Sequence, residues 1–260
     1  MLTEESVGYR ETLPAPALQP LVECVWSITA PVPQPNYLVL PDGCVDVVFS
    51  PRIGLRVVGA MTAARAHALQ VGDDFVGIRF QPGAAGRFLG VAPGELTDLS
   101  IPLEELWGTR GRRLCEQLQN APSASACAHL LAENMLPGLR HPGAIERAIA
   151  ALVARHGAAD LDWLARQANL SPRQLRRRCR ELTGLTPKQL GRILRFRRAV
   201  DLLSFGAGRG WAHLAVECGY YDQSHFIHEF RAFSGSTPAE YDAAQSRGGR
   251  FFQSGSSAVA

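Results

Sequence analysis

Short apolar segments alternate with proline and glycine residues between residues 21 and 80. LVECVWSI, NYLVLPDGCVDVVF, LRVVGAM and FVGIRF are rich in the residue types that strands favour. Within two of them the apolar side chains recur at every second position, at Val45, Val47 and Phe49 and at Val76, Ile78 and Phe80. A period of two is typical of a strand with one buried face, so this region predicts a β-sheet.

The pattern changes after residue 90. LEELWGTRGRRLCEQL and SASACAHLLAENML carry apolar residues at helical spacing, and prolines and glycines then gather at residues 136–143. We therefore predict a β-rich N-terminal domain with flanking helices over residues 1–138, followed by a linker. With 46% hydrophobic residues in 260, the chain is long enough to bury a core in each of two domains.

Residues 143–243 predict an all-α domain. Asp160, Ser171 and Asp222 are each placed to cap the start of a helix, and Pro172 suits the first helical position. Thr186-Pro187 begins a longer helix, KQLGRILRFRRAVDLLSF, that would span roughly 25 Å. The fold class is therefore α+β, with the helices of the second half forming a unit of their own.

An internal repeat organises these helices. Each copy has a helix with Leu-Ala, a short turn, a second helix, a glycine and a Thr-Pro restart. Leu164-Ala165 matches Leu214-Ala215 at a separation of 50, and the later positions match at 51. The later matches pair Leu175, Cys179, Gly184 and Thr186-Pro187 with Phe226, Phe230, Gly235 and Thr237-Pro238. Two copies are too few for a solenoid, and the pattern favours two helix-turn-helix units joined by one long helix.

Charge divides the chain in the same place. Residues 1–140 hold 10 Arg and 14 Asp or Glu, a formal net charge of −4. Residues 141–260 hold 17 Arg or Lys and 10 Asp or Glu, a net charge of +7. This asymmetry favours a polyanionic partner for the second half, although a merely solvated surface would also account for it.

The second helix of each unit has an outward face suited to DNA. With Leu175, Cys179 and Leu182 inward, the first helix exposes Arg173, Arg176, Arg177 and Arg180. The second exposes Gln223, Ser224, His225 and His228. Arginine makes paired contacts with guanine and with phosphate, so the pattern predicts two recognition helices in successive segments of a major groove.

The second half resembles the DNA-binding domain of the AraC/XylS family of bacterial transcriptional regulators over residues 143–243. The most specific stretch runs from Gly219 to Pro238 and matches at Gly219, Tyr220, Asp222, Ser224, Phe226, Phe230, Gly235, Thr237 and Pro238. Cys179 departs from the family, which usually has an aromatic residue there. The resemblance implies base contacts from Arg173, Arg176 and Arg177 and from Gln223, Ser224, His225 and His228.

It also implies partners. Double-stranded DNA and RNA polymerase are expected, and because many family members dimerise, helices between residues 102 and 136 are candidates for a homodimer contact. The first half more loosely resembles the β-rich sensor domain of some such regulators, in YLVLPDGCVDVVF and GIRFQPGAAGRFLG. If it binds a small-molecule effector, Trp26, Asp42, Asp46 and Arg79 are the lining groups we predict. The alternative is that PDG is a simple turn and Trp26 a core residue.

Other functions are open at this point. Asp42, Asp46, His67 and Arg79 would allow acid–base chemistry in the first half, but no nucleophile–base spacing supports it. Cys24 and Cys44 are candidates for an electrophile or redox sensor, although buried free thiols are the ordinary interpretation. The arginine-rich helix would also serve as a protein-docking face. His225, His228 and Glu229 lie close enough for a metal site but lack matching ligands. We therefore predict no enzyme, metal or cofactor.

The ends of the chain add little. No basic and apolar leader is visible at the start, and no apolar run is long enough to span a membrane. The sequence therefore predicts a cytoplasmic protein. Residues 244–260, rich in glycine and serine, predict a disordered tail.

Overall fold

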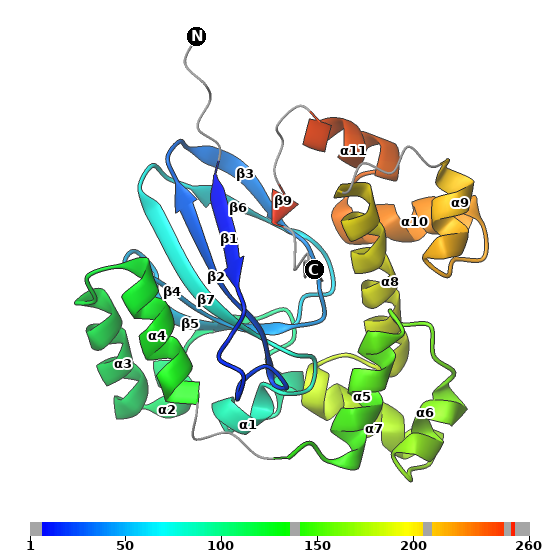
Figure 1. The fold of residues 1–260 in the computed structure, drawn as a ribbon, viewed down its shortest axis with the longest axis horizontal. Helices are drawn as coiled ribbons and strands as arrows, with labels where there is room; N and C mark the ends of the chain where they lie inside the picture. The colour runs from blue at the N-terminus through cyan, green and yellow to red at the C-terminus, as the bar shows by residue number, and fades with distance from the viewer. Residues whose placement is uncertain (1–6, 136–140, 205–209, 247–250, 253–260) are drawn as a thin grey trace.

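A computed structural model describes residues 7–135, 141–204, 210–246 and 251–252. Figure 1 shows a β-rich part with helices along one side, and a separate group of helices on the other side. The linker predicted at residues 136–143 falls largely outside the described residues, because 136–140 are not among them. No helix in the described ranges is long and apolar enough to cross a membrane.

The larger sheet has six strands in the order β1-β2-β7-β4-β5-β8, and every neighbouring pair in it is antiparallel. A smaller sheet has the order β6-β3-β9. The strands are β1 (Gly8–Thr12), β2 (Val22–Ala30), β3 (Gln34–Val39), β4 (Val45–Ser50), β5 (Gly54–Val58), β6 (Arg65–Leu69), β7 (Asp73–Phe80), β8 (Ser100–Pro102) and β9 (Phe251–Phe252). Strands β1, β6 and β8 were not predicted, because they are short and lack a clear apolar alternation.

The alternation in the sequence decides which face of the larger sheet each residue occupies. Val45, Val47 and Phe49 of β4 point into a core beneath helices α3 and α4, as the period of two predicts. The intervening Asp46 and Val48 therefore point to the opposite face, toward the smaller sheet. The same alternation in β7 places Arg79 on that opposite face.

The helices of the N-terminal part cover the other face of the larger sheet. They are α1 (Gly86–Leu89), η1 (Pro93–Glu95), α2 (Glu104–Trp107), α3 (Thr109–Gln119) and α4 (Ala124–Met135). Leu114, Leu118, Leu131 and Met135 are buried against the strands, and Figure 1 shows α3 and α4 side by side along the sheet. This confirms the β-rich unit with flanking helices.

The C-terminal part contains the two predicted helix-turn-helix units. Its helices are α5 (Ala144–Ala154), α6 (Leu161–Gln167), α7 (Pro172–Thr183), α8 (Pro187–Ser204), α9 (Trp211–Glu217), α10 (Gln223–Ser234) and α11 (Pro238–Ser246). The predicted caps are confirmed, since Asp160, Ser171 and Asp222 each accept a backbone N–H of the helix that follows. Gly184 and Gly235 end the two recognition helices in the left-handed conformation.

Helix α8 joins the two units and is the centre of their core. Its Leu190, Ile193, Phe196 and Val200 belong to one buried cluster that also takes in residues of α5–α7 and α9–α11. The Phe196 ring packs edge-on to Phe230 of α10, with centroids 5.0 Å apart. One continuous core therefore fixes both units against α8.

The two parts of the chain are in direct contact. Arg87 of α1 pairs with Glu146 of α5 at 2.6 Å, and Thr97 Oγ1 donates to the carbonyl oxygen of Gly184 at 2.9 Å. The backbone N–H of Ala64 donates to the carbonyl oxygen of Phe233. These contacts involve both helix-turn-helix units.

The predicted disordered tail is wrong in two places. Helix α11 continues to Ser246, and Phe251–Phe252 forms the short strand β9 parallel to β3. The open edge of β3 offers unpaired backbone groups, which a passing segment can satisfy whatever its composition. Residues 247–250 and 253–260 lie outside the described part of the chain.

Candidate nucleic-acid interface and inter-sheet cavity

Helix α7 presents a row of arginines to solvent. Arg173, Arg176, Arg177 and Arg180 are all exposed, while Leu175 and Cys179 are buried beneath them. Arg177 and its neighbour Arg178 pair with Glu181, at 2.8 and 3.3 Å. Arg173 and Arg176 form no ion pair with any residue that the structure describes. Exposed ion pairs are weak, so all four predicted arginines are accessible to a phosphate or a base edge.

The outward face of α10 is less uniform. Gln223, Ser224 and His228 are exposed, as predicted. His225 is only partly exposed, because its ring meets the edge of Tyr220 and its Nε2 lies 3.5 Å from Glu229. His225 thus packs against its own unit while keeping 40% of its side chain exposed.

Helix α8 braces α10 through a buried carboxylate. Glu229 Oε1 accepts from Arg192 at 2.5 Å, and Glu229 Oε2 lies 3.8 Å from Arg195. The two arginines belong to α8, so the orientation of α10 is tied to the connecting helix. A recognition helix held in this way presents its outward side chains in one fixed direction.

The N-terminal part reaches the edge of the arginine face. A groove of about 500 Å³ lies between η1 and α7, with Glu95 on one wall and Arg176, Arg177 and Arg180 on the other. A duplex laid along α7 would therefore pass close to η1.

A second concave site lies between the two sheets. This cavity of about 410 Å³ is lined by all four predicted effector residues, Trp26, Asp42, Asp46 and Arg79. The structure thus brings together residues that stand up to 53 positions apart in the sequence. Its walls are largely apolar and aromatic, and they include Tyr37 of the smaller sheet and Val48, Val58 and Phe75 of the larger one.

Strand register explains why these residues meet. Asp46 of β4 and Trp26 of β2 flank β7, where their partners are Arg79 and Gly77. A side chain on Gly77 would lie 2.4 Å from the Trp26 indole, so the ring lies directly over this glycine. Trp26 is also buried, so it is a core residue and a part of the cavity wall at the same time.

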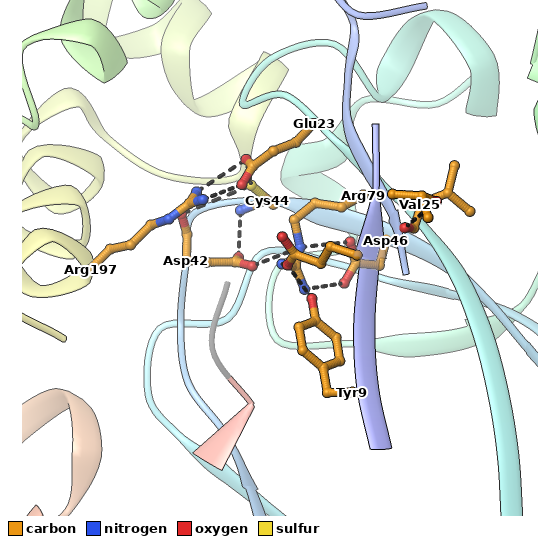
Figure 2. Close-up of polar contacts among 10 residues, drawn as sticks. Tyr9, Glu23, Val25, Asp42, Cys44, Asp46, Arg79 and Arg197 are labelled. Atoms are coloured by element: carbon orange, nitrogen blue, oxygen red, sulfur yellow. Dashed lines mark hydrogen bonds and ion pairs between the residues drawn. The ribbon is translucent and has the colours of Figure 1, made fainter. Parts of the chain in front are cut away.

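The guanidinium of Arg79 forms ion pairs with several carboxylates at the end of the cavity (Figure 2). Arg79 is fully buried; its Nε lies 3.0 Å from Asp42 Oδ2 and 3.3 Å from Asp46 Oδ1, and its Nη1 lies 3.6 Å from Glu11 Oε1. Burial would lower the pKa of Arg79, but Asp46 and Asp42 outweigh it and raise that pKa. Burial raises the pKa of Asp46 against the opposing effect of Arg79. Three carboxyl groups therefore share the guanidinium of Arg79.

Comparison with known proteins bears on both parts of the chain. Residues 164–244 match the family described as "Helix-turn-helix domain", and residues 10–102 match a domain of unknown function, DUF6597. The chain is 39% identical over 84 residues to the HTH-type transcriptional regulator GadX of Escherichia coli O6:H1. The C-terminal part thus contains a helix-turn-helix domain similar to that of a known transcriptional regulator, in agreement with the AraC/XylS resemblance of its sequence motifs.

The similarity to known regulators is strongest in the C-terminal part. The GadX match covers 31% of this chain and spans only 30% of the length of GadX. The DNA-binding domain of AdpA, solved with a target DNA, is 30% identical and covers 41% of this chain and 96% of its own, with a TM-score of 0.38. ToxT of Vibrio cholerae O395 covers 92% of this chain and 99% of its own at 10% identity, with a TM-score of 0.43.

The two cysteines considered as sensors are poorly suited to that role. Cys24 and Cys44 are both buried, and burial raises the pKa of each thiol. Reactive cysteines need an accessible thiolate and therefore a lowered pKa. The sensor alternative does not agree with this environment.

The histidines of α10 do not converge on a metal either. Glu229, the carboxylate nearest to them in sequence, is turned inward and held by Arg192 and Arg195, while His228 is exposed. No group of three potential ligands occurs among the described residues. The side chain of Glu229 serves the packing of α10 on α8.

Sequence reasoning missed two charged residues that join the domains. Glu23 of β2 and Arg197 of α8 form a largely buried ion pair, with Arg197 Nη1 lying 3.1 Å from Glu23 Oε2. Burial would raise the pKa of Glu23, but Arg197 outweighs it and holds that pKa below its usual range. Their positions, 174 residues apart, carry no signal of this pairing, since each looks like an ordinary surface charge.

Asp201 lies one turn beyond Arg197 on α8, and we expect it to make the folding stability of the protein depend on pH. Burial raises its pKa to about 7, against the attraction of Arg197 and aided by Glu23 and Glu11. Because the folded-state pKa exceeds the unfolded one, near 3.9, the stability this group contributes is present below about pH 4 and lost as pH rises through about 7.

Asp201→Asn should therefore raise the urea midpoint at about pH 8 and leave it nearly unchanged at about pH 4. The exposed Asp74 provides the matched control, because Asp74→Asn removes the same charge without relieving a buried one. An Asp201→Asn variant whose stability gain is equal at both pH values would contradict the assignment.

Proposed function

We propose that this chain is a sequence-specific regulator of transcription that binds double-stranded DNA through α7 and α10. The observation that carries the proposal is the pair of capped helices whose outward faces are exposed while their inward faces share one core with α8. The residues we assign to DNA are Arg173, Arg176, Arg177, Arg180, Gln223, Ser224, His225 and His228. The four arginines supply attraction to phosphate and paired contacts with guanine, and the α10 face supplies hydrogen-bonding groups with less charge.

The test is recovery of genomic DNA fragments by the purified full-length protein, followed by affinity measurements on a duplex carrying the recovered site. Affinity should fall steeply with salt, by about 10³-fold between roughly 50 and 200 mM if six or so phosphates are contacted. A protein-docking role for α7 predicts no enrichment of any DNA sequence. Failure to enrich a common site would therefore reject the proposal.

We further propose that the inter-sheet cavity binds a small effector. Its apolar walls suit a small organic molecule, and the surplus of acceptors around Arg79 suits a ligand that donates hydrogen bonds to Asp42 or Asp46. Thermal-shift screening of compound classes suggested by the neighbouring genes would identify it, since a ligand that binds only the folded protein raises Tm. We also propose that the protein contacts RNA polymerase and that it forms a homodimer through α3 and α4.

The same cavity is where an enzyme activity would lie, and we propose that it has none. His67 lines it together with Asp42, Asp46 and Arg79. However, both carboxylates are engaged with one buried guanidinium, and burial raises the pKa of Cys44 beside them. None of these groups is thereby prepared as a nucleophile. Turnover of a ligand found in the thermal-shift screen would contradict this.

A further inference from the structure

The turn at residues 41–44 connects the cavity to the helix that joins the two recognition units. Asp42 and Cys44 line the cavity, and Asp42 Oδ1 accepts from the backbone N–H of Cys44 at 2.9 Å. Cys44 Sγ in turn donates to Glu23 Oε2 at 3.4 Å, and Glu23 pairs with Arg197 of α8. Figure 2 shows this continuous series of polar contacts from Asp46 and Arg79 to Arg197.

The same turn also touches α8 sterically. Gly43 has a φ of +82°, and a Cβ built there would lie 2.7 Å from Leu190 Cδ1 of α8. The backbone of the turn therefore lies against the Leu190 side chain of α8, which any side chain larger than a hydrogen at position 43 would have to displace. Because Leu190 is itself buried in the core around α8, a displacement of the turn toward α8 has to be accommodated by this core.

The Glu23–Arg197 ion pair at the far end of this series is costly to separate. The side chains of Glu23 and Arg197 are 13% and 15% exposed, so solvent screens their attraction little. Separating two largely buried charges leaves each uncompensated and is strongly unfavourable, unlike the loss of a surface pair. Movement of β2 or of the 41–44 turn is thus coupled to Arg197.

Helix α8 carries the consequence to the DNA-binding face. Arg192 and Arg195, within two turns of Arg197, hold α10 through Glu229. Each unit also has a hydrogen bond to the N-terminal part, at Gly184 after α7 and at Phe233 of α10. A shift of α8 acts on α10 through the two charged contacts of Glu229 in addition to the shared core, so it changes the position of α10 relative to α7, which determines whether both fit one duplex.

We propose that the 41–44 turn and the Glu23–Arg197 pair transmit occupancy of the inter-sheet cavity to α8, which makes Glu23 and Arg197 positioning residues for DNA binding. The proposal rests on the proposed function of the cavity and of α7 and α10. A ligand that donates to Asp42 or Asp46 competes with Arg79 for them, and the turn that carries Asp42 is the element that responds.

The test replaces the unidentified ligand by a side chain that fills the cavity. Val58 faces the cavity and is the cross-strand partner of Asp46, so Val58→Phe places a ring beside Asp46. In the full-length protein, Val58→Phe should change the Kd for the recovered duplex by about fivefold or more. In the Glu23→Gln/Arg197→Gln background, the same substitution should change the Kd by less than about twofold.

The Arg87–Glu146 pair provides the matched control. It is also a buried ion pair between the two parts of the chain, but neither residue lines the cavity. The effect of Val58→Phe should persist in the Arg87→Gln/Glu146→Gln background. If the effect is equally large in all three backgrounds, or absent from the otherwise native chain, the proposed coupling is wrong.

Two additions keep the outcome decisive. If Val58→Phe does not fold, as judged by its thermal midpoint, Val39→Phe fills the cavity from the smaller sheet instead. Hydrogen exchange of the α8 amides gives a readout that needs no DNA, and it should respond to cavity filling only when Glu23 and Arg197 are both present. The two proposals can therefore fail separately. If the native protein enriches no DNA site but cavity filling still changes the hydrogen exchange of α8, the proposed function is wrong and the coupling is supported.

Discussion

Arg79→Met should cost about 3–5 kcal/mol of folding free energy, the largest loss we expect from a single charged residue. Methionine fills much of the volume of the arginine but leaves Asp42, Asp46 and Glu11 without their buried cation. Arg79 opposes the effect of burial on Asp46, so its loss raises the pKa of Asp46 further, and the destabilisation should shrink as the pH falls from about 8 toward 5. Urea unfolding across this pH range measures both effects.

Asp46→Asn is the matched control for this prediction. It removes one of the competing carboxylates and leaves Arg79 paired with Asp42 and Glu11. Because burial raises the pKa of Asp46, the ionised form opposes folding, and the asparagine variant should be close to native in stability at neutral pH. An Arg79→Met protein as stable as Asp46→Asn would show that the cluster is solvated rather than buried.

Arg176→Ala should weaken binding to the recovered DNA site by about 1–3 kcal/mol, or roughly 5- to 150-fold. Arg176 is exposed on the middle of α7, makes no ion pair with a described residue, and lines the groove beside η1. If it contacts a base pair, the variant should also relax the preference at one position of the site. Competition with duplexes mutated at single positions measures this loss.

Arg113→Ala is a suitable control because Arg113 is an exposed arginine of α3, in the N-terminal part. Its loss removes the same charge and should change affinity by less than about twofold, because solvent and salt screen distant surface charges. A different result would show that Arg176 contacts the DNA backbone and not a base. In that case Arg176→Ala would weaken binding to all DNA sequences equally, and the slope of log affinity against log salt concentration would fall by about one phosphate contact. Unchanged affinity would remove it from the interface.

Local pattern was sufficient for the helical half of this protein. The caps at Asp160, Ser171 and Asp222, the glycines that end α7 and α10, and the repeat of Leu-Ala and Thr-Pro all act within a few residues of the backbone that they shape. Such signals survive in any tertiary context, so the elements and the outward arginines of α7 were predictable. The choice of Trp26, Asp46 and Arg79 as neighbours succeeded for a related reason, because strand alternation puts them on one face, and Asp42 joins them from the turn that precedes β4.

Tertiary structure alone decided how these parts meet. The pairing of Glu23 with Arg197, the seating of Gly43 on Leu190 and the strand at Phe251–Phe252 each join segments far apart in the chain. No local preference of these residues specifies a distant partner, because an ion pair or a backbone ladder is satisfied by any complementary group brought within reach. The sequence by itself therefore determined the helix-turn-helix units and which strand residues share a face of the larger sheet, whereas packing between the domains determined the link between cavity and recognition helices.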